Sequence, residues 1–218
     1  MQEKLFDQLP VEITASIREA LPKLKTLLHE EGVVHFEKII AEFGGEEIYT
    51  LSFYYNAGDW GYILPTFATE KGLEDVAEEY MENSGGSLED NKSQLRWSPC
   101  DSPYHGFDYF FSDKVDDILE KLERETGEAS DYIAEKKLPD RDGYRASTAV
   151  IVEIYQMIHD EVIEALQQVA LSPKIVEYRK KHRCLIVLEA GDMDPDVLDQ
   201  DLVTLNGETV FDVMKSWD

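Results

Sequence analysis

The sequence predicts an α+β fold in which several helices cover an antiparallel sheet. Apolar residues recur at helical spacing over most of the chain, but after residues 46–47 the period changes to alternation. Helices and strands come in separate runs, and the two clearest strands form a hairpin and not a strand–helix–strand unit. We expect one domain over residues 1–218, with a helical segment at residues 1–45 packed onto it.

The first third of the chain is predicted to be helical. Apolar residues from Ile13 to Leu28 recur on one helical face, and Gly32 is expected to end this helix. Pro22 lies inside the pattern, so we expect a kink or a break there. A second, shorter helix is predicted over residues 36–43.

A hairpin is the clearest local feature. Residues 48–55 alternate between polar and apolar, and a second strand returns over residues 60–68 after a turn. Pro65 has no backbone N–H, which places the return strand at an edge or a bulge. Thr69 is expected to cap a following helix, and residues 93–97 are predicted to form a third strand.

The second half is again mostly helical. A helix beginning after Ser112 is expected to end at Gly127. Residues 143–171 carry the longest apolar stripe, so we expect this helix to pack on the sheet as the central helix of the fold. A short basic helix at residues 179–183 then leads into a last strand over residues 184–189.

The chain is strongly acidic, with 46 Asp and Glu residues, 21 Lys and Arg residues and a net charge of −25. Such a field repels nucleic-acid phosphates and anionic membranes, and it attracts basic partners. The simpler explanation is that excess carboxylates keep a protein dispersed. We therefore expect no nucleic acid and no membrane, and a basic protein such as a toxin is the candidate partner. The oligomeric state is left open.

Cysteine content and the absence of a leader predict a cytoplasmic protein. Two cysteines, Cys100 and Cys184, make no disulfide framework in a chain of 218 residues, and reduced thiols are normal in a cytosol. The residues after Met1 do not resemble a signal peptide, and no window approaches about 18 uninterrupted apolar residues.

Residues 94–107 are the strongest candidate for a site. This segment combines a cation, several rings, a thiol, a carboxylate and two prolines. Such a composition is unfavourable in an ordinary connecting loop, because prolines fix the backbone and aromatic rings need apolar surroundings. We expect Trp97 to point inward and Tyr104 and His105 to face solvent. Arg96 and Asp101 could equally form a structural pair. The candidate binding residues here are Arg96, Trp97, Asp101, Tyr104 and His105.

The sequence shows no complete catalytic constellation. It contains no glycine-rich phosphate loop and no G-x-S-x-G elbow, and its five histidines are scattered. Cys100 and His105 could act as nucleophile and base, but two prolines and the lack of an orienting group weaken this interpretation. We therefore predict no catalytic residue, no metal and no cofactor, and we favour a non-enzymatic protein.

An aspartate-rich loop superficially resembles a calcium site. Asp192, Asp194 and Asp196 have the spacing of the first ligands of an EF-hand. However, Val197 stands where the sharp turn needs glycine, and Val203 stands where the bidentate glutamate is needed. The EF-hand is rejected, and the three aspartates are kept as candidate binding residues.

A family resemblance rests on four segments. They are the strand at residues 48–55, Phe67-Ala68-Thr69-Glu70, the box Leu95-Arg96-Trp97-Ser98-Pro99, and residues 185–192 with Leu205-Asn206. From about Leu21 to the C-terminus the chain resembles an uncharacterised bacterial family, a domain of unknown function. The Arg-Trp-Ser-Pro box is its most specific element. Family members commonly have an acidic residue and a second Trp after the box, where this chain has residues 100–104.

Three classes of function remain open. The first is a binding or neutralising protein that occludes a basic partner; an immunity-like role is an analogy with families found near toxin genes. The second is a small-molecule-binding domain around Trp97 and Tyr104. The third, less favoured, is a hydrolase-type enzyme that uses Cys100, His105 or the Asp192 loop. The resemblance supplies no catalytic residues that could be assigned here. Because the sequence shows no complete catalytic constellation, we prefer the first two classes.

Overall fold

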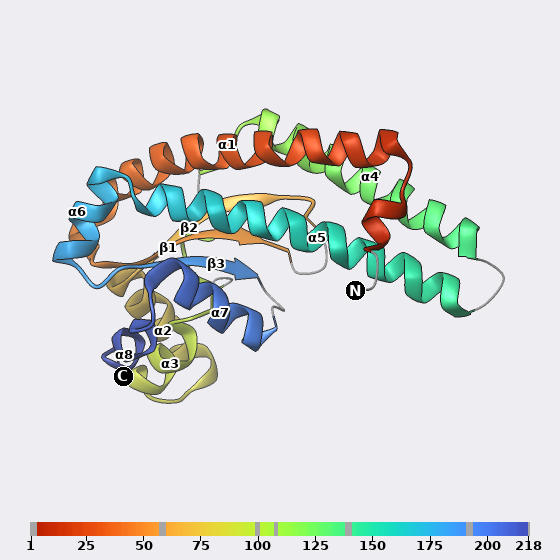
Figure 1. The fold of residues 1–218 in the computed structure, drawn as a ribbon. Coiled ribbons are helices and arrows are strands. Elements are labelled where there is room, and N and C mark those ends of the chain that lie inside the picture. The colour runs from red at the N-terminus through yellow and green to blue at the C-terminus, as the bar shows by residue number, and fades with distance from the viewer. Residues whose placement is uncertain are drawn as a thin grey trace.

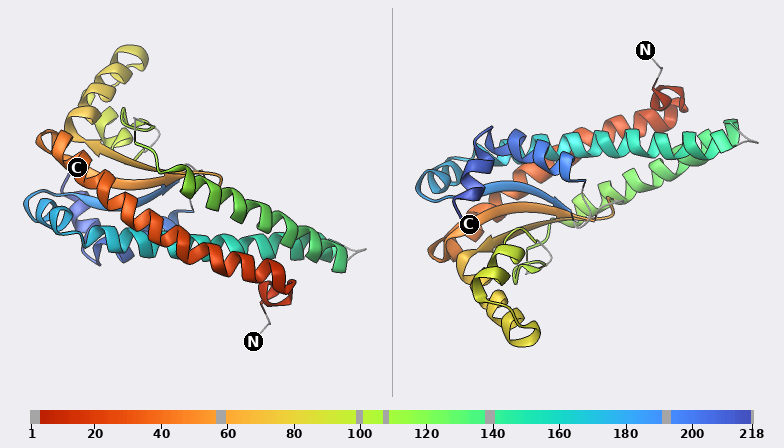
Figure 2. Two further views of the ribbon diagram at one scale, coloured as in Figure 1. Left: turned by 90° about the horizontal axis from the view of Figure 1, so that it is seen from above. Right: turned by 90° about the horizontal axis from the view of Figure 1, so that it is seen from below.

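Two of the three long helices lie over one face of a small sheet, and the third packs against them beyond the end of the sheet (Figures 1 and 2). The computed structural model describes residues 4–56, 60–98, 101–106, 109–137, 141–190 and 194–217. The long helices are α1 (Val11–Phe43), α4 (Asp113–Lys137) and α5 (Arg141–Ala170). They extend beyond the sheet as a bundle (Figure 2). The other face carries α2 (Glu70–Ser84), α3 (Leu88–Leu95), α7 (Pro195–Asn206) and α8 (Val210–Lys215). The predicted α+β class is confirmed.

The sheet is mixed, whereas a purely antiparallel sheet was predicted. It contains β1 (Ile48–Tyr55), β2 (Ile63–Thr69) and β3 (Leu185–Ala190) in the order β2-β1-β3. β1 and β2 form the predicted antiparallel hairpin, but β3 pairs with β1 in parallel. A parallel pair needs a long crossover connection, which β2, the helices α2 to α5 and a short helix after α5 supply here. Every residue of the central strand β1 is buried.

Helix α1 is continuous, although two helices were predicted. It passes through Pro22 without a break, because the residues around the proline are packed in the core. Gly32 does not end the helix either. A Cβ atom on Gly32 would lie 2.6 Å from Cζ of Phe53 and 3.0 Å from Cγ2 of Val169. The glycine therefore allows α1 to approach β1 and α5 closely.

Gly32→Ala is expected to destabilise the protein by about 1–3 kcal/mol, because the added methyl group overpacks the contact with Phe53. Gly127→Ala in α4 is the matched control, since a Cβ atom there meets nothing within 4 Å. That variant should be slightly more stable, by up to about 1 kcal/mol, because alanine is the better helix former. Urea denaturation measures both changes. A Gly32→Ala variant as stable as the wild type would contradict the close approach.

Two further predictions, one of a strand and one of a helix end, were wrong. Residues 93–97 form the end of α3 and a turn, not a strand. The Ser87 hydroxyl accepts a hydrogen bond from the Asp90 amide and so caps the helix. Helix α4 continues past Gly127 because residues beyond it, such as Ala129, are buried in the core.

Helix α5 is the central packing helix predicted for residues 143–171. It contacts α1, α4, α7 and β3. Its fully buried residues include Val150, Ile154, Ile158, Val162, Leu166 and Val169. The short helix α6 (Pro173–Lys181) follows, and two 3₁₀ turns, η1 (Leu5–Gln8) and η2 (Gly44–Glu46), flank α1. Among the described residues, no helix has both the length and the apolar character needed to cross a membrane.

Candidate functional site

Arg96 lies at the end of α3, where its buried side chain connects several elements. Its guanidinium forms a two-pronged ion pair with Glu70, the first residue of α2, with Nη2 3.1 Å from Oε2. Its Cζ atom lies 5.1 Å from the ring centre of Tyr49 and 5.9 Å from that of Trp217. The Tyr49 hydroxyl donates to the carbonyl oxygen of Arg96 at 2.9 Å. With only 8% of its surface exposed, Arg96 is primarily an anchor between α2, α3, β1 and the C-terminal segment.

Trp97 is partly buried between two small apolar clusters. One cluster is formed by β1, α2 and α3, and the other by β3, α7 and α8. The ring centre of Trp97 lies 5.8 Å from that of Tyr49 and 5.6 Å from that of Trp217, both in edge-on contacts. Such contacts hold the two helix pairs together. The ring packs inward, in agreement with the orientation expected from the sequence.

Asp101 does not pair with Arg96. Its carboxylate accepts hydrogen bonds from the hydroxyls of Ser98 and Tyr80, the latter at 2.7 Å. The first contact closes the turn after the Arg-Trp-Ser-Pro box, and the second connects that turn to α2. Asp101 therefore orders the segment around it, and the alternative of an Arg96–Asp101 pair is not adopted.

Tyr104 and His105 were expected to face solvent, but both are half-buried. Tyr104 stacks on Phe67 with ring centres 4.3 Å apart, and its hydroxyl donates to Glu46 at 2.7 Å. His105 lies edge-on to Tyr54 at 4.5 Å, and burial lowers its pKa. Both side chains pack against aromatic rings of β1 and β2 instead of facing solvent, because these contacts remove apolar surface from water. Cys100 lies outside the described residues, so the predicted Cys100–His105 pair is not placed.

The predicted aspartate loop is described only in part. Asp194 is the N-cap of α7, and its carboxylate accepts a hydrogen bond from the Asp196 amide at 2.9 Å. Asp194 therefore has a structural role at a helix start, and its side chain and that of Asp196 are exposed. Asp192 lies outside the described residues.

Two titratable residues with shifted pKa values were not selected from the sequence. Alternation along β3 places Glu189 on the face of Leu185 and Val187, toward α7 and α8. Burial raises the pKa of Glu189 to about 8, and the neighbouring Ser52 hydroxyl opposes this shift only in part. The second residue is His159.

His159 and Asp201 form a buried pair that joins α5 to α7. Nε2 of His159 lies 2.8 Å from Oδ2 of Asp201, and the two side chains are 13% and 7% exposed. Burial by itself would lower the pKa of His159, but the hydrogen bond and charge of Asp201 raise it. The pair was not predicted because its members are 42 positions apart.

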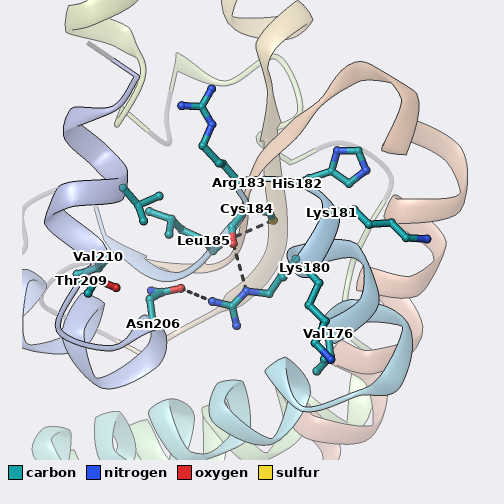
Figure 3. A pocket seen from close by; sticks show the side chains of 12 residues that line it. Val176, Lys180, Lys181, His182, Arg183, Cys184, Leu185, Asn206, Thr209 and Val210 are labelled. Carbon is teal, nitrogen blue, oxygen red and sulfur yellow. Dashed lines mark hydrogen bonds between the residues drawn. The ribbon is translucent and has the colours of Figure 1, made fainter.

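Two adjoining cavities open beside the C-terminal end of α6. The first, with a volume of about 470 Å³, lies between α6, β3 and the start of α8 (Figure 3). The second, of about 570 Å³, lies beside Arg96 and Trp217. Both are lined by Lys181, His182 and Arg183. We name the first the α6 cavity, and none of the described residues that line it carries a carboxylate. Elsewhere in the described part of the chain, no group of three or more His, Cys, Asp or Glu side chains is placed to hold a metal ion.

The basic residues of the α6 cavity were not selected as a site from the sequence. The signal was present, because residues 179–183 form a run of cations and a histidine in a chain with a net charge of −25. That run was interpreted only as a short basic helix before the last strand. Its significance depends on the opposite wall of the cavity, which α8 and Asn206 supply from a distant part of the chain.

A family model described as a domain of unknown function (DUF4303) matches residues 28–156. The chain belongs to this family. The DUF4303 region contains the second half of α1, the hairpin, the Arg-Trp-Ser-Pro segment and the first half of α5. It ends before the residues of the α6 cavity. The expected membership of a family of unknown function is thus confirmed, over residues 28–156. Neither the curated proteins nor the solved structures contain a match to the chain.

Proposed function

We propose that this DUF4303 protein is a non-enzymatic binding protein that recognises a basic protein through the acidic surface of α2. The observation that carries the proposal is a set of exposed carboxylates on this one helix. They are Glu74, Asp75, Glu78, Glu79 and Glu82. Among the described residues, none of the five forms an ion pair. Their charge is therefore available to a partner.

The position of α2 supports this proposal. The helix projects from the end of the molecule, away from the long bundle (Figure 2). Tyr80 and Met81 are 41% and 39% exposed among the carboxylates. Tyr and Met are enriched in protein interfaces, and acidic groups around them accelerate association with a basic partner. The hydrogen bond from Tyr80 to Asp101 holds the tyrosine ring in place.

An immunity-like role is the specific form of this proposal. A protein that neutralises a basic toxin needs a rigid surface of complementary charge and no chemistry of its own. The charge of −25 and the lack of a catalytic constellation in the sequence both favour such a role. The link to toxins is an analogy between families, not a property of the fold.

Neutralising one face of α2 tests the proposal. Glu74→Gln, Glu78→Gln and Glu82→Gln together remove three charges spaced one helical turn apart. A partner is captured from lysate at low salt and identified, and its association rate is then measured by surface plasmon resonance. We expect a stoichiometric partner of positive net charge, with association slowed about tenfold or more by the triple variant and by added salt.

The matched control removes three exposed carboxylates from α4, through Glu120→Gln, Glu128→Gln and Glu135→Gln. This variant should bind nearly as fast as the wild type. Equal slowing by both variants would contradict a specific α2 surface, as would an acidic partner or no stoichiometric partner. Slowing only after Asp194→Asn and Asp196→Asn would place the partner at α7 and overturn the assignment to α2.

A further inference from the structure

The α6 cavity contains cations that no described carboxylate neutralises. Arg179, Lys180 and Arg183 line it, and none of the three forms an ion pair with another described residue. The chain has 46 Asp and Glu residues for 21 Lys and Arg residues, so a wall whose described residues include several cations and no carboxylate is unusual here. We infer that this cavity binds a small organic phosphate.

Arg179 is the central donor of this site. Its Nε donates to the carbonyl oxygen of Cys184 at 3.1 Å, and its Nη2 donates to Oδ1 of Asn206 at 2.8 Å. A guanidinium has five N–H donors. These two bonds fix its plane, and the other donors meet no acceptor among the described residues, which leaves them for a ligand. The side chain is half-buried, and burial lowers its pKa. A desolvated guanidinium with free donors is well suited to bind a phosphate.

Asn206 holds Arg179 in this position. Its amide group is fully engaged, because Oδ1 also accepts from the Ile186 amide at 2.9 Å and Nδ2 donates to the Ile186 carbonyl at 2.7 Å. These bonds attach the end of α7 to the free edge of β3. Figure 3 shows Asn206 between Thr209 and Val210 on one side and the Lys180–Arg183 run on the other. The donors are therefore fixed before a ligand arrives, which reduces the entropic cost of binding.

Helix-dipole compensation does not explain all of these cations. Basic residues in the last turn of a helix interact favourably with its C-terminal carbonyls. Lys181 fits this role, and it also pairs with Glu177 at 2.7 Å. The hydrogen bonds of Arg179, in contrast, go to β3 and α7, outside its own helix. Arg183 donates to the carbonyl of Ser216 and lies 5.2 Å from the ring centre of Trp217.

The size and lining of the cavity indicate the class of ligand. A volume of about 470 Å³ suits a small molecule. Val176, Leu185, Val210 and Val213 form the apolar part of the wall, which suits the organic part of such a ligand. A net charge of −25 opposes the approach of a nucleic acid or an acidic protein, since their many charges extend beyond the cavity. A compact phosphate ester, in contrast, has its charge within the cavity, beside the cations of the wall and away from the acidic surface of the rest of the chain.

The thiol in the wall favours binding over catalysis. Cys184 is buried, and burial raises its pKa to about 12. A thiol in this state is a poor nucleophile near neutral pH. The site therefore contributes charge and shape but no reactive sulfur.

Titration with phenyl phosphate tests the inference, with inorganic phosphate and benzoate as parallel probes. Calorimetry measures affinity at constant ionic strength, and backbone amide shifts locate the site. We expect saturable binding of phenyl phosphate, weaker binding of both other probes, and shifts concentrated in residues 176–185 and 206–213. Arg179→Gln should weaken binding about tenfold or more, because it removes a charged donor.

Two neighbouring exposed lysines provide a matched pair of variants that should both fold normally. Lys180→Gln removes an exposed cation of the cavity wall, and Lys181→Gln removes one that is paired with Glu177. We expect the first to weaken binding several-fold and the second by less than about twofold. The inference is overturned if no probe binds saturably, if the shifts fall elsewhere, or if benzoate binds as tightly as phenyl phosphate. Equal effects of the two lysine variants would also overturn it, because they would indicate diffuse attraction. The result is independent of any partner at α2.

Discussion

Replacing Arg96 with alanine is expected to lower the free energy of unfolding by about 3 kcal/mol or more. The change leaves the carboxylate of Glu70 without its partner, although that side chain is only 25% exposed. It also removes the packing of the guanidinium against Tyr49 and Trp217. Urea denaturation followed by tryptophan fluorescence measures the loss, because Trp97 and Trp217 lie at the affected contact.

Two further variants separate the ion pair from general surface effects. Lys23→Ala removes an exposed pair with Glu19 and should leave the stability almost unchanged. A double-mutant cycle with Glu70→Gln should give a clear coupling energy with Arg96→Ala, because the two side chains are in direct contact. If Arg96→Ala is no more destabilising than Lys23→Ala, then Arg96 does not anchor α2, and the Arg-Trp-Ser-Pro box requires another explanation.

The predictable parts of the fold are those that local pattern determines. The β1–β2 hairpin follows from alternation and a short turn, and α5 follows from a long apolar stripe. The Thr69 cap was also correctly predicted, since its hydroxyl accepts a hydrogen bond from the Gly72 amide. The prediction that Gly32 ends a helix was wrong. A glycine is needed there because Phe53 and Val169, which are distant in sequence, pack against it. The parallel pairing of β3 likewise depends on helices that come between the two strands.

The candidate site was predicted only in part, for a similar reason. The chemistry of Arg96, Trp97 and Tyr104 made the segment conspicuous, and the structure gives each of them specific contacts. Those contacts are mostly within the protein, so the unusual composition reflects anchoring of the segment. The α6 cavity, in contrast, combines ordinary residues from two distant stretches of the chain. Only folding places Asn206 against Arg179.

Glu189→Gln is expected to remove a large part of the pH dependence of stability. Burial raises the pKa of Glu189 from 4.5 to about 8, so the folded state favours the protonated carboxyl. This contribution is fully present below pH 4.5 and is lost as the pH rises toward 8, where the partly buried carboxyl group must ionise. Between pH 4.5 and 8 the loss amounts to roughly 4 kcal/mol, since one pKa unit corresponds to about 1.4 kcal/mol. A glutamine keeps the neutral form at every pH, so the variant should be the more stable protein at pH 8.

Urea denaturation at intervals from pH 4.5 to 8 measures this difference. His159 also has a raised pKa, so its contribution to the free energy of unfolding is likewise lost as the pH rises through that pKa. Because His159 is present in both proteins, this contribution cancels in the comparison. Glu208→Gln, on the exposed approach to α8, is the control and should reproduce the wild-type profile. Parallel profiles for Glu189→Gln and the wild type would show that Glu189 ionises freely in the folded protein. In that case water reaches the face of β3 that α7 and α8 cover, and the packing of those two helices is looser than their contacts with Leu185 and Val187 indicate.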